Sequence, residues 1–125
     1  MNSQNPLLRN FAQRAASRLN TEEYKEVFLD PATIVMILSI LSTLIQGIKL
    51  YCQLKKGQSI GEVIMTNAQN NTVRSKMMLK KAATQHIPKN LNIFQRHKYL
   101  KGISNSIRET CLESDQAEIE TLVNS

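Results

Sequence analysis

Hydrophobic positions recur every three or four residues along most of this chain. This spacing places them on one side of a helix, first over residues 6–19 and then over a shorter segment, 20–29, in which Asn20 and Glu23 form a capping pair. Together these segments predict an N-terminal unit of amphipathic helices, residues 1–29. No segment shows the strict alternation of a half-buried β-strand. The pattern therefore predicts an all-α protein.

The most strongly marked element is a long hydrophobic helix, residues 30–56. Asp30 is a typical N-cap, Pro31 suits the first helical position, and Gly57 can supply a C-terminal cap. Between Pro31 and Ile48, 18 consecutive residues carry no formal charge. At about 1.5 Å per residue they extend roughly 27 Å, close to the ~30 Å hydrocarbon core of a bilayer. Their length alone is compatible with a short membrane span.

A polar stripe along this helix gives a second interpretation. Ser39, Ser42, Thr43 and Gln46 recur at steps of three and four, so the stripe covers one side and leaves the remainder apolar. Small hydroxyl side chains allow a partner helix to approach closely, in soluble bundles and in membranes alike. We expect a helix enclosed by protein, with a bilayer span as the alternative. The residues expected to pack against helices or lipid are Ile34, Ile37, Leu38, Ser39, Leu41, Ser42, Thr43, Leu44, Ile45, Gln46 and Ile48.

Beyond this helix the chain becomes polar and then basic. Residues 57–72 are rich in Gly, Gln, Asn, Ser and Thr, and they predict a polar connector with one turn of structure. Residues 73–125 predict a basic helical region with an acidic tail. It contains a helix over 73–86, a longer helix over 91–113 and a short last helix capped by Ser114.

The charge is unevenly distributed along the chain. The net charge is +6, and no acidic residue occurs between Val63 and Arg108. Cations gathered on one face attract phosphate backbones or anionic lipid headgroups, although an ordinary solvated surface has the same composition. No helix-turn-helix or zinc-finger signature accompanies them, so base-specific recognition is not expected. The residues expected to contact nucleic acid or an anionic surface are Arg74, Lys76, Lys80, Lys81, Arg96, Lys98, Lys101 and Arg108.

The acidic tail, residues 109–120, carries five of the ten acids in the chain. Opposite charges within one chain attract when they come within about 10 Å at moderate ionic strength. We therefore expect the tail to fold back on the basic region or to pair with a neighbouring copy.

Signatures of catalysis are missing from the sequence. Cys52 and Cys111 match no zinc or redox spacing and predict two free thiols, and His86 and His97 have no neighbouring ligand pattern. There is no glycine-rich phosphate loop, nucleophile elbow or paired-carboxylate motif. We expect no enzymatic activity, no cofactor and no metal site.

These patterns predict an extended helical hairpin or a small irregular bundle around one long hydrophobic helix, completed by partner chains. The expected function is that of a non-catalytic structural subunit of a larger assembly, favoured as a small virion or nucleoprotein component such as a phage internal or DNA-delivery protein. Its expected partners are helical protein subunits, including copies of itself, and nucleic acid. The alternative is a single-pass accessory subunit of a membrane complex, with its basic region at anionic headgroups on the cytoplasmic side. A virion or intracellular assembly is the expected location, and a membrane is the alternative.

Overall fold

The computed structural model describes residues 5–19, 32–54 and 57–124. No strand occurs among these residues, which confirms the all-α prediction. The helix predicted over residues 20–29 and the cap residues Asp30 and Pro31 lie outside the described residues. In chain order the helices are α1 (Pro6–Ser17), α2 (Ala32–Leu54), α3 (Ile60–Asn70), α4 (Val73–Thr84), α5 (Ile93–Glu113) and α6 (Gln116–Val123).

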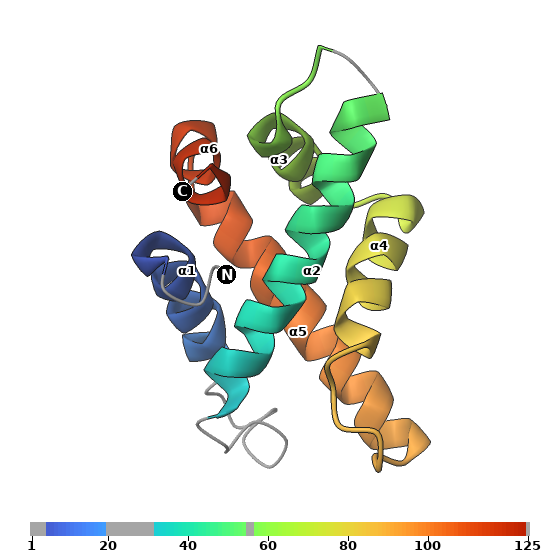
Figure 1. The fold of residues 1–125 in the computed structure, drawn as a ribbon. Helices are drawn as coiled ribbons and strands as arrows, with labels where there is room; N and C mark the ends of the chain where they lie inside the picture. The colour runs from blue at the N-terminus through green and yellow to red at the C-terminus, as the bar shows by residue number, and fades with distance from the viewer. Residues whose placement is uncertain (1–4, 20–31, 55–56, 125) are drawn as a thin grey trace.

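The helices form a small irregular bundle and not an extended hairpin. The two longest helices cross, with α5 running diagonally behind α2, and α1 and α4 lie on opposite sides of α2 (Figure 1). α1, α3 and α4 each pack against α2 and also against α5. α6 packs mainly on α3. The shorter helices α1, α3 and α4 are therefore each held by both long helices, α2 and α5.

The core consists mainly of aliphatic and small side chains, with Phe11 and Tyr99 as aromatic members, in keeping with an aromatic content of only 5%. Ile37 of α2 and Ile103 of α5 are completely buried. Burying one such side chain contributes about 1.5–3 kcal/mol to stability. Ala15 of α1 and Ala83 of α4 are also completely buried. Because alanine carries only a methyl group, α1 and α4 can approach their neighbours closely at these positions.

Helix α3 occupies the segment that was predicted to be a polar connector. This local prediction was wrong, because residues 60–70 form three turns of continuous helix. Ser59 caps its start, and the Ser59 side chain accepts a hydrogen bond from the Glu62 backbone N–H. Val63 and Met65 are buried, so α3 contributes to the core. The helix ends at Asn71, whose φ of 47° is left-handed, a conformation that asparagine tolerates better than most residues.

The start of the last helix also differs from the prediction. Asp115 is the N-cap of α6, and its carboxylate accepts from the Glu118 backbone N–H at 2.7 Å. Ser114, the predicted cap, instead ends α5 and donates its hydroxyl hydrogen to the Thr110 carbonyl. The two helices therefore meet without a longer connector.

Candidate functional site

The hydrophobic side of α2 is mostly covered by the rest of the chain. Of the residues expected to pack against helices or lipid, Ile37, Leu38, Leu41, Ile45 and Ile48 are buried. Ile34, Ser39, Ser42, Thr43 and Leu44 are half-buried, and Gln46 is exposed. The stretch Ala32–Cys52 is long and apolar enough to cross a membrane, with 39% of its most apolar window buried inside the fold.

The polar stripe of α2 lies along its less covered side. Ser39 donates its hydroxyl hydrogen to the Val35 carbonyl of the same helix, so this group is satisfied without a partner helix. Thr43 does reach another element, because its hydroxyl oxygen lies 2.7 Å from Nε2 of His86 in the turn after α4. The stripe therefore links α2 to one neighbour and otherwise faces outward.

Two acids of the tail, Glu113 and Glu118, contact arginines at the end of α1, whereas Glu109 pairs with Arg108 of the basic region. Glu113 pairs with Arg14 at 3.4 Å and also with Arg18, and Glu118 lies 3.7 Å from Arg14. The hydrogen bond from Arg18, followed by its positive charge, lowers the pKa of the Glu113 carboxyl. Arg14 of α1 and Arg18, which follows the helix, are thereby neutralised within the chain.

The eight cations predicted to contact an anion, here called the basic face, remain largely without acidic partners. Among the described residues, the one ion pair that any of them forms joins Arg108 to the adjacent Glu109 at 3.8 Å. Arg74, Lys76, Lys80, Lys81 and Lys101 are exposed, whereas Arg96, Lys98 and Arg108 are half-buried. The positive charge of the basic face is therefore largely not balanced by nearby acids, unlike that of Arg14 and Arg18.

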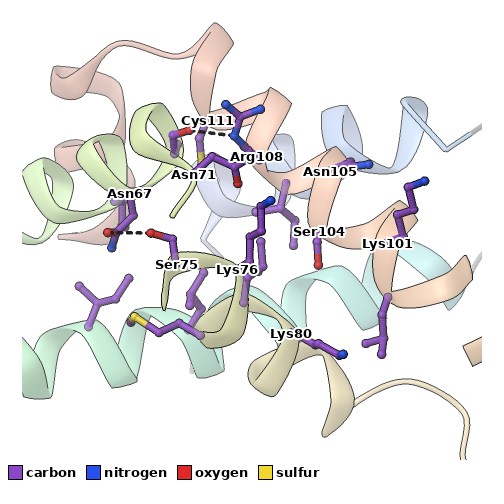
Figure 2. Close-up of a pocket in the computed structure, with 18 of the residues that line it drawn as sticks. Asn67, Asn71, Ser75, Lys76, Lys80, Lys101, Ser104, Asn105, Arg108 and Cys111 are labelled. Carbon is purple, nitrogen blue, oxygen red and sulfur yellow. Dashed lines mark hydrogen bonds between the residues drawn. The ribbon is translucent and has the colours of Figure 1, made fainter. Parts of the chain in front are cut away.

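Four members of the basic face surround one cavity. A space of about 330 Å³ lies between α2, α3, α4 and α5, and its lining includes Lys76, Lys80, Lys101 and Arg108. Lys76 and Lys80 come from α4, and Lys101 and Arg108 come from α5 (Figure 2). No acidic residue is among the described residues that line it.

The remaining members of the basic face lie elsewhere. Arg74 lines a smaller space of about 190 Å³ beside Tyr51 and Val63. Lys81, Arg96 and Lys98 line neither space. The structure thus divides the basic face into a group around the larger cavity and a group on the outer surface of α4 and α5.

Arg108 has a structural role besides its charge. Its Nε donates a hydrogen bond of 2.9 Å to the Ala68 carbonyl, which joins the middle of α5 to α3 (Figure 2). Part of its guanidinium is therefore already engaged, so Arg108 is a weaker candidate for ligand contact than the three lysines.

Sequence reasoning missed the uncharged polar residues around the cavity. They are Asn67, Asn71, Ser75, Ser104 and Asn105. Ser75 donates its hydroxyl hydrogen to the Asn67 side-chain oxygen at 3.1 Å, which links α4 to α3 (Figure 2). Two of these residues, Asn67 and Asn71, belong to α3 or its C-terminal cap, the element that was predicted as a connector. The pair Ser59 and Glu62 carried the signal for this helix, since Ser followed three residues later by Glu is typical of a helix start.

Two residues of the cavity lining, His97 and Cys111, carry side chains of a type that can bind metals or act as nucleophiles. Burial raises the pKa of the Cys111 thiol to about 12, although the positive charge of Arg14 lowers it slightly. At neutral pH this thiol stays protonated, and a protonated thiol is a poor nucleophile and metal ligand. In the part of the chain that the structure describes, no three His, Cys, Asp or Glu side chains gather in a way that could hold a metal ion. What the arrangement offers is binding of an anion.

Comparison with known proteins adds no relative. No protein-family model, curated protein or solved structure matches this chain. The functional argument therefore depends on the residues and their geometry.

Proposed function

We propose that this protein is a non-catalytic helical subunit of a larger assembly and that it contacts nucleic acid through its basic face. The observation that carries the proposal is the division of charge across the molecule. Arg14 and Arg18, at the end of α1, are paired with Glu113 and Glu118, whereas the cations of α4 and the first part of α5 have no acid beside them. Unpaired cations of this kind neutralise phosphates and release counterions, which gives affinity without sequence preference.

An exposed aromatic ring favours nucleic acid over other polyanions. Phe94, in the first turn of α5, is 85% exposed and stands close in sequence to Arg96 and Lys98. Protein surfaces that bind single strands combine cations along the backbone with aromatic rings on which bases stack, worth about 1–3 kcal/mol per base. The single-stranded form is therefore the preferred ligand.

Exposed apolar side chains support a subunit role. Val35 and Leu50 of α2 are 60% and 62% exposed, and Met77 of α4 is 64% exposed. Large apolar side chains that remain in solvent lose the favourable free energy of burial, which a partner subunit can supply. A virion or nucleoprotein particle provides both such partners and nucleic acid.

Charge reversal on the outer surface tests this proposal. We expect Lys81→Glu combined with Lys98→Glu to weaken binding of a fluorescent single-stranded oligonucleotide by at least about 10- to 100-fold, since each reversal removes an attraction of about 1 kcal/mol. Fluorescence anisotropy at low salt measures the affinity. Both residues lie outside the larger cavity, so these substitutions leave the cavity lining unchanged.

A matched control separates the basic face from net charge. Arg9→Glu combined with Lys49→Glu changes the net charge equally, at two exposed positions on α1 and α2. We expect this pair to change the affinity by less than about threefold. Equal losses from the two pairs, or no binding by the unmodified protein, would contradict the proposal.

The second candidate function is a single-pass accessory subunit of a membrane complex, and the length and apolar character of α2 favour it. In this fold, however, Ile37, Leu41 and Ile45 are buried against other helices while Gln46 and Lys49 are exposed. An exposed amide or ammonium in hydrocarbon is costly. Alkaline carbonate extraction of membranes from expressing cells decides between the two, because only a spanning helix resists extraction.

A further inference from the structure

The larger cavity has two chemically different parts. Its deeper wall is aliphatic and drawn from four helices: Leu44 and Ile48 of α2, Ile64 of α3, Leu79 of α4, and Leu100 and Ile107 of α5. Its rim carries the exposed amines of Lys76, Lys80 and Lys101. Its volume of about 330 Å³ lies within the range of roughly 300–1,000 Å³ that is usual for small-molecule sites.

We propose that this cavity binds a small organic anion with an apolar chain, of the medium-chain fatty-acid class. The chain would lie against the aliphatic wall, where each buried methylene contributes about 0.8 kcal/mol. The carboxylate would lie at the rim, which Lys76 of α4 and Lys101 of α5 both line (Figure 2). A hydrogen bond between ionised groups is roughly twice as strong as one between neutral groups.

The polar residues at the rim fit the same ligand. Ser104 and Asn105 lie on α5 between Lys101 and Arg108, and Asn71 lies across from them at the end of α3 (Figure 2). Their hydroxyl and amide groups can donate hydrogen bonds to a carboxylate. With three lysines and no acid among the described lining residues, the rim repels cationic ligands and attracts anionic ones.

The cavity shares four cations with the basic face, but its aliphatic wall and the outer cations Lys81 and Lys98 can be distinguished. A phosphodiester backbone has no aliphatic chain to place against Ile48, Leu100 and Ile107, all of which are buried. Conversely, Lys81 and Lys98 lie outside the cavity and cannot hold the anion within it. The two sites can therefore be tested with different variants.

A set of three probes tests the proposal in the full-length protein. Octanoate has both the chain and the charge, octanol has the chain without the charge, and acetate has the charge without the chain. We expect octanoate to bind with the highest affinity in isothermal titration calorimetry. In parallel nuclear magnetic resonance titrations, the protein's backbone amides whose chemical shifts change on adding octanoate should be concentrated in the middle of α5 and in α3. Octanol binding as tightly as octanoate, acetate producing the same shifts at the same concentration, or shifts spread over the whole chain would each overturn the proposal.

Charge-neutral variants place the carboxylate. We expect Lys76→Gln combined with Lys101→Gln to weaken octanoate binding by about tenfold or more, since a charge-assisted hydrogen bond contributes about 1.5–3 kcal/mol, and to leave octanol binding within about twofold. The matched control is Lys81→Gln combined with Lys98→Gln, which removes the same charge from the same two helices outside the cavity. Equal weakening by both pairs would show a general effect of charge and contradict the proposed site.

A blocking variant separates this site from the nucleic-acid surface. Ser104→Leu extends a larger side chain into the cavity from a half-buried position on α5. We expect at least a tenfold loss of octanoate affinity with unchanged oligonucleotide affinity, and circular dichroism verifies the fold. If the unmodified protein does not bind the oligonucleotide, the octanoate result still tests the cavity. If it does not bind octanoate, the oligonucleotide result still tests the nucleic-acid surface. If the variant does not fold, the lysine pair above decides the question.

Discussion

Glu113, at the end of α5, belongs to a group of ion pairs that joins α1, α5 and α6. It accepts from Arg14 and Arg18, and it stands 99 positions from Arg14 in the chain. Partial exposure of these side chains keeps the stabilisation from each ion pair small. Their main effect is on the distribution of charge, because they give Arg14 and Arg18 acidic partners, whereas the lysines of α4 and α5 have none among the described residues. One glutamate thereby helps to define which side of the molecule is basic.

The lowered pKa of Glu113 predicts a pH dependence of stability. A carboxyl whose pKa is lower in the folded state than in the unfolded state stabilises the fold above its unfolded pKa of about 4.3, and the contribution is lost as the pH falls through the folded value. We expect Glu113→Gln to lower the free energy of unfolding at pH 7 and to have a much smaller effect below about pH 3. Urea denaturation at the two pH values measures this difference. An equal effect at both would show that the Glu113 charge is not involved.

At the residue scale, the sequence predicted the identities of the charged residues but not their pairing. A basic region without acids is visible directly in the sequence, and Lys76, Lys80 and Lys101 are exposed as expected. The contacts of Glu113 and Glu118 with α1 depend on how α1 packs on α5 and α6. No local pattern encodes a contact across such a separation, so the contacts with α1 were not anticipated, and pairing of the tail with a neighbouring copy stays a prediction.

Among the elements, helix periods were the most predictable features. α2, α4 and α5 occur close to their predicted ranges because each carries an apolar stripe of helical period. α3 was missed because Gly61 and an Asn-rich end gave it the composition of a loop. Its tertiary environment compensates: the Glu120 carboxylate of α6 accepts from the Ser59 hydroxyl and the Glu62 backbone N–H. A negative charge at a helix N-terminus is favourable, so α6 helps to stabilise α3.

This arrangement explains why residue 61 is glycine and gives a prediction. A Cβ atom at Gly61 would overlap the Glu120 side chain, which would have to move away from the start of α3. In the unmodified protein we expect Gly61→Ala to be neutral or destabilising. In a Glu120→Ala background the same substitution should stabilise by about 0.5–1 kcal/mol, the usual helix advantage of alanine over glycine.

The double-mutant cycle for Gly61 and Glu120 is read from urea unfolding curves of the four proteins. Contacting residues usually couple by about 0.5–3 kcal/mol. Equal effects of Gly61→Ala in the two backgrounds would mean that Glu120 does not cap α3.

The whole molecule combines an internally covered hydrophobic helix with an asymmetric surface charge. Sequence reasoning anticipated a buried α2 but expected other chains to cover it, whereas in this fold α1, α3 and α4 bury much of its apolar side. The larger cavity could not be anticipated at all, because four helices distant in sequence form its wall. Its chemistry depends on packing angles that no single segment specifies.

At this scale the central claim is that the unpaired basic face binds nucleic acid by neutralising phosphates. The most direct test is the slope of log affinity against log salt concentration for a single-stranded oligonucleotide. We expect a slope of about −3 or steeper, which corresponds to about four or more neutralised phosphates at ~0.7 each, and a shallower slope by about 1.4 after reversal of Lys81 and Lys98. A slope near zero, or one that these reversals leave unchanged, would contradict the account.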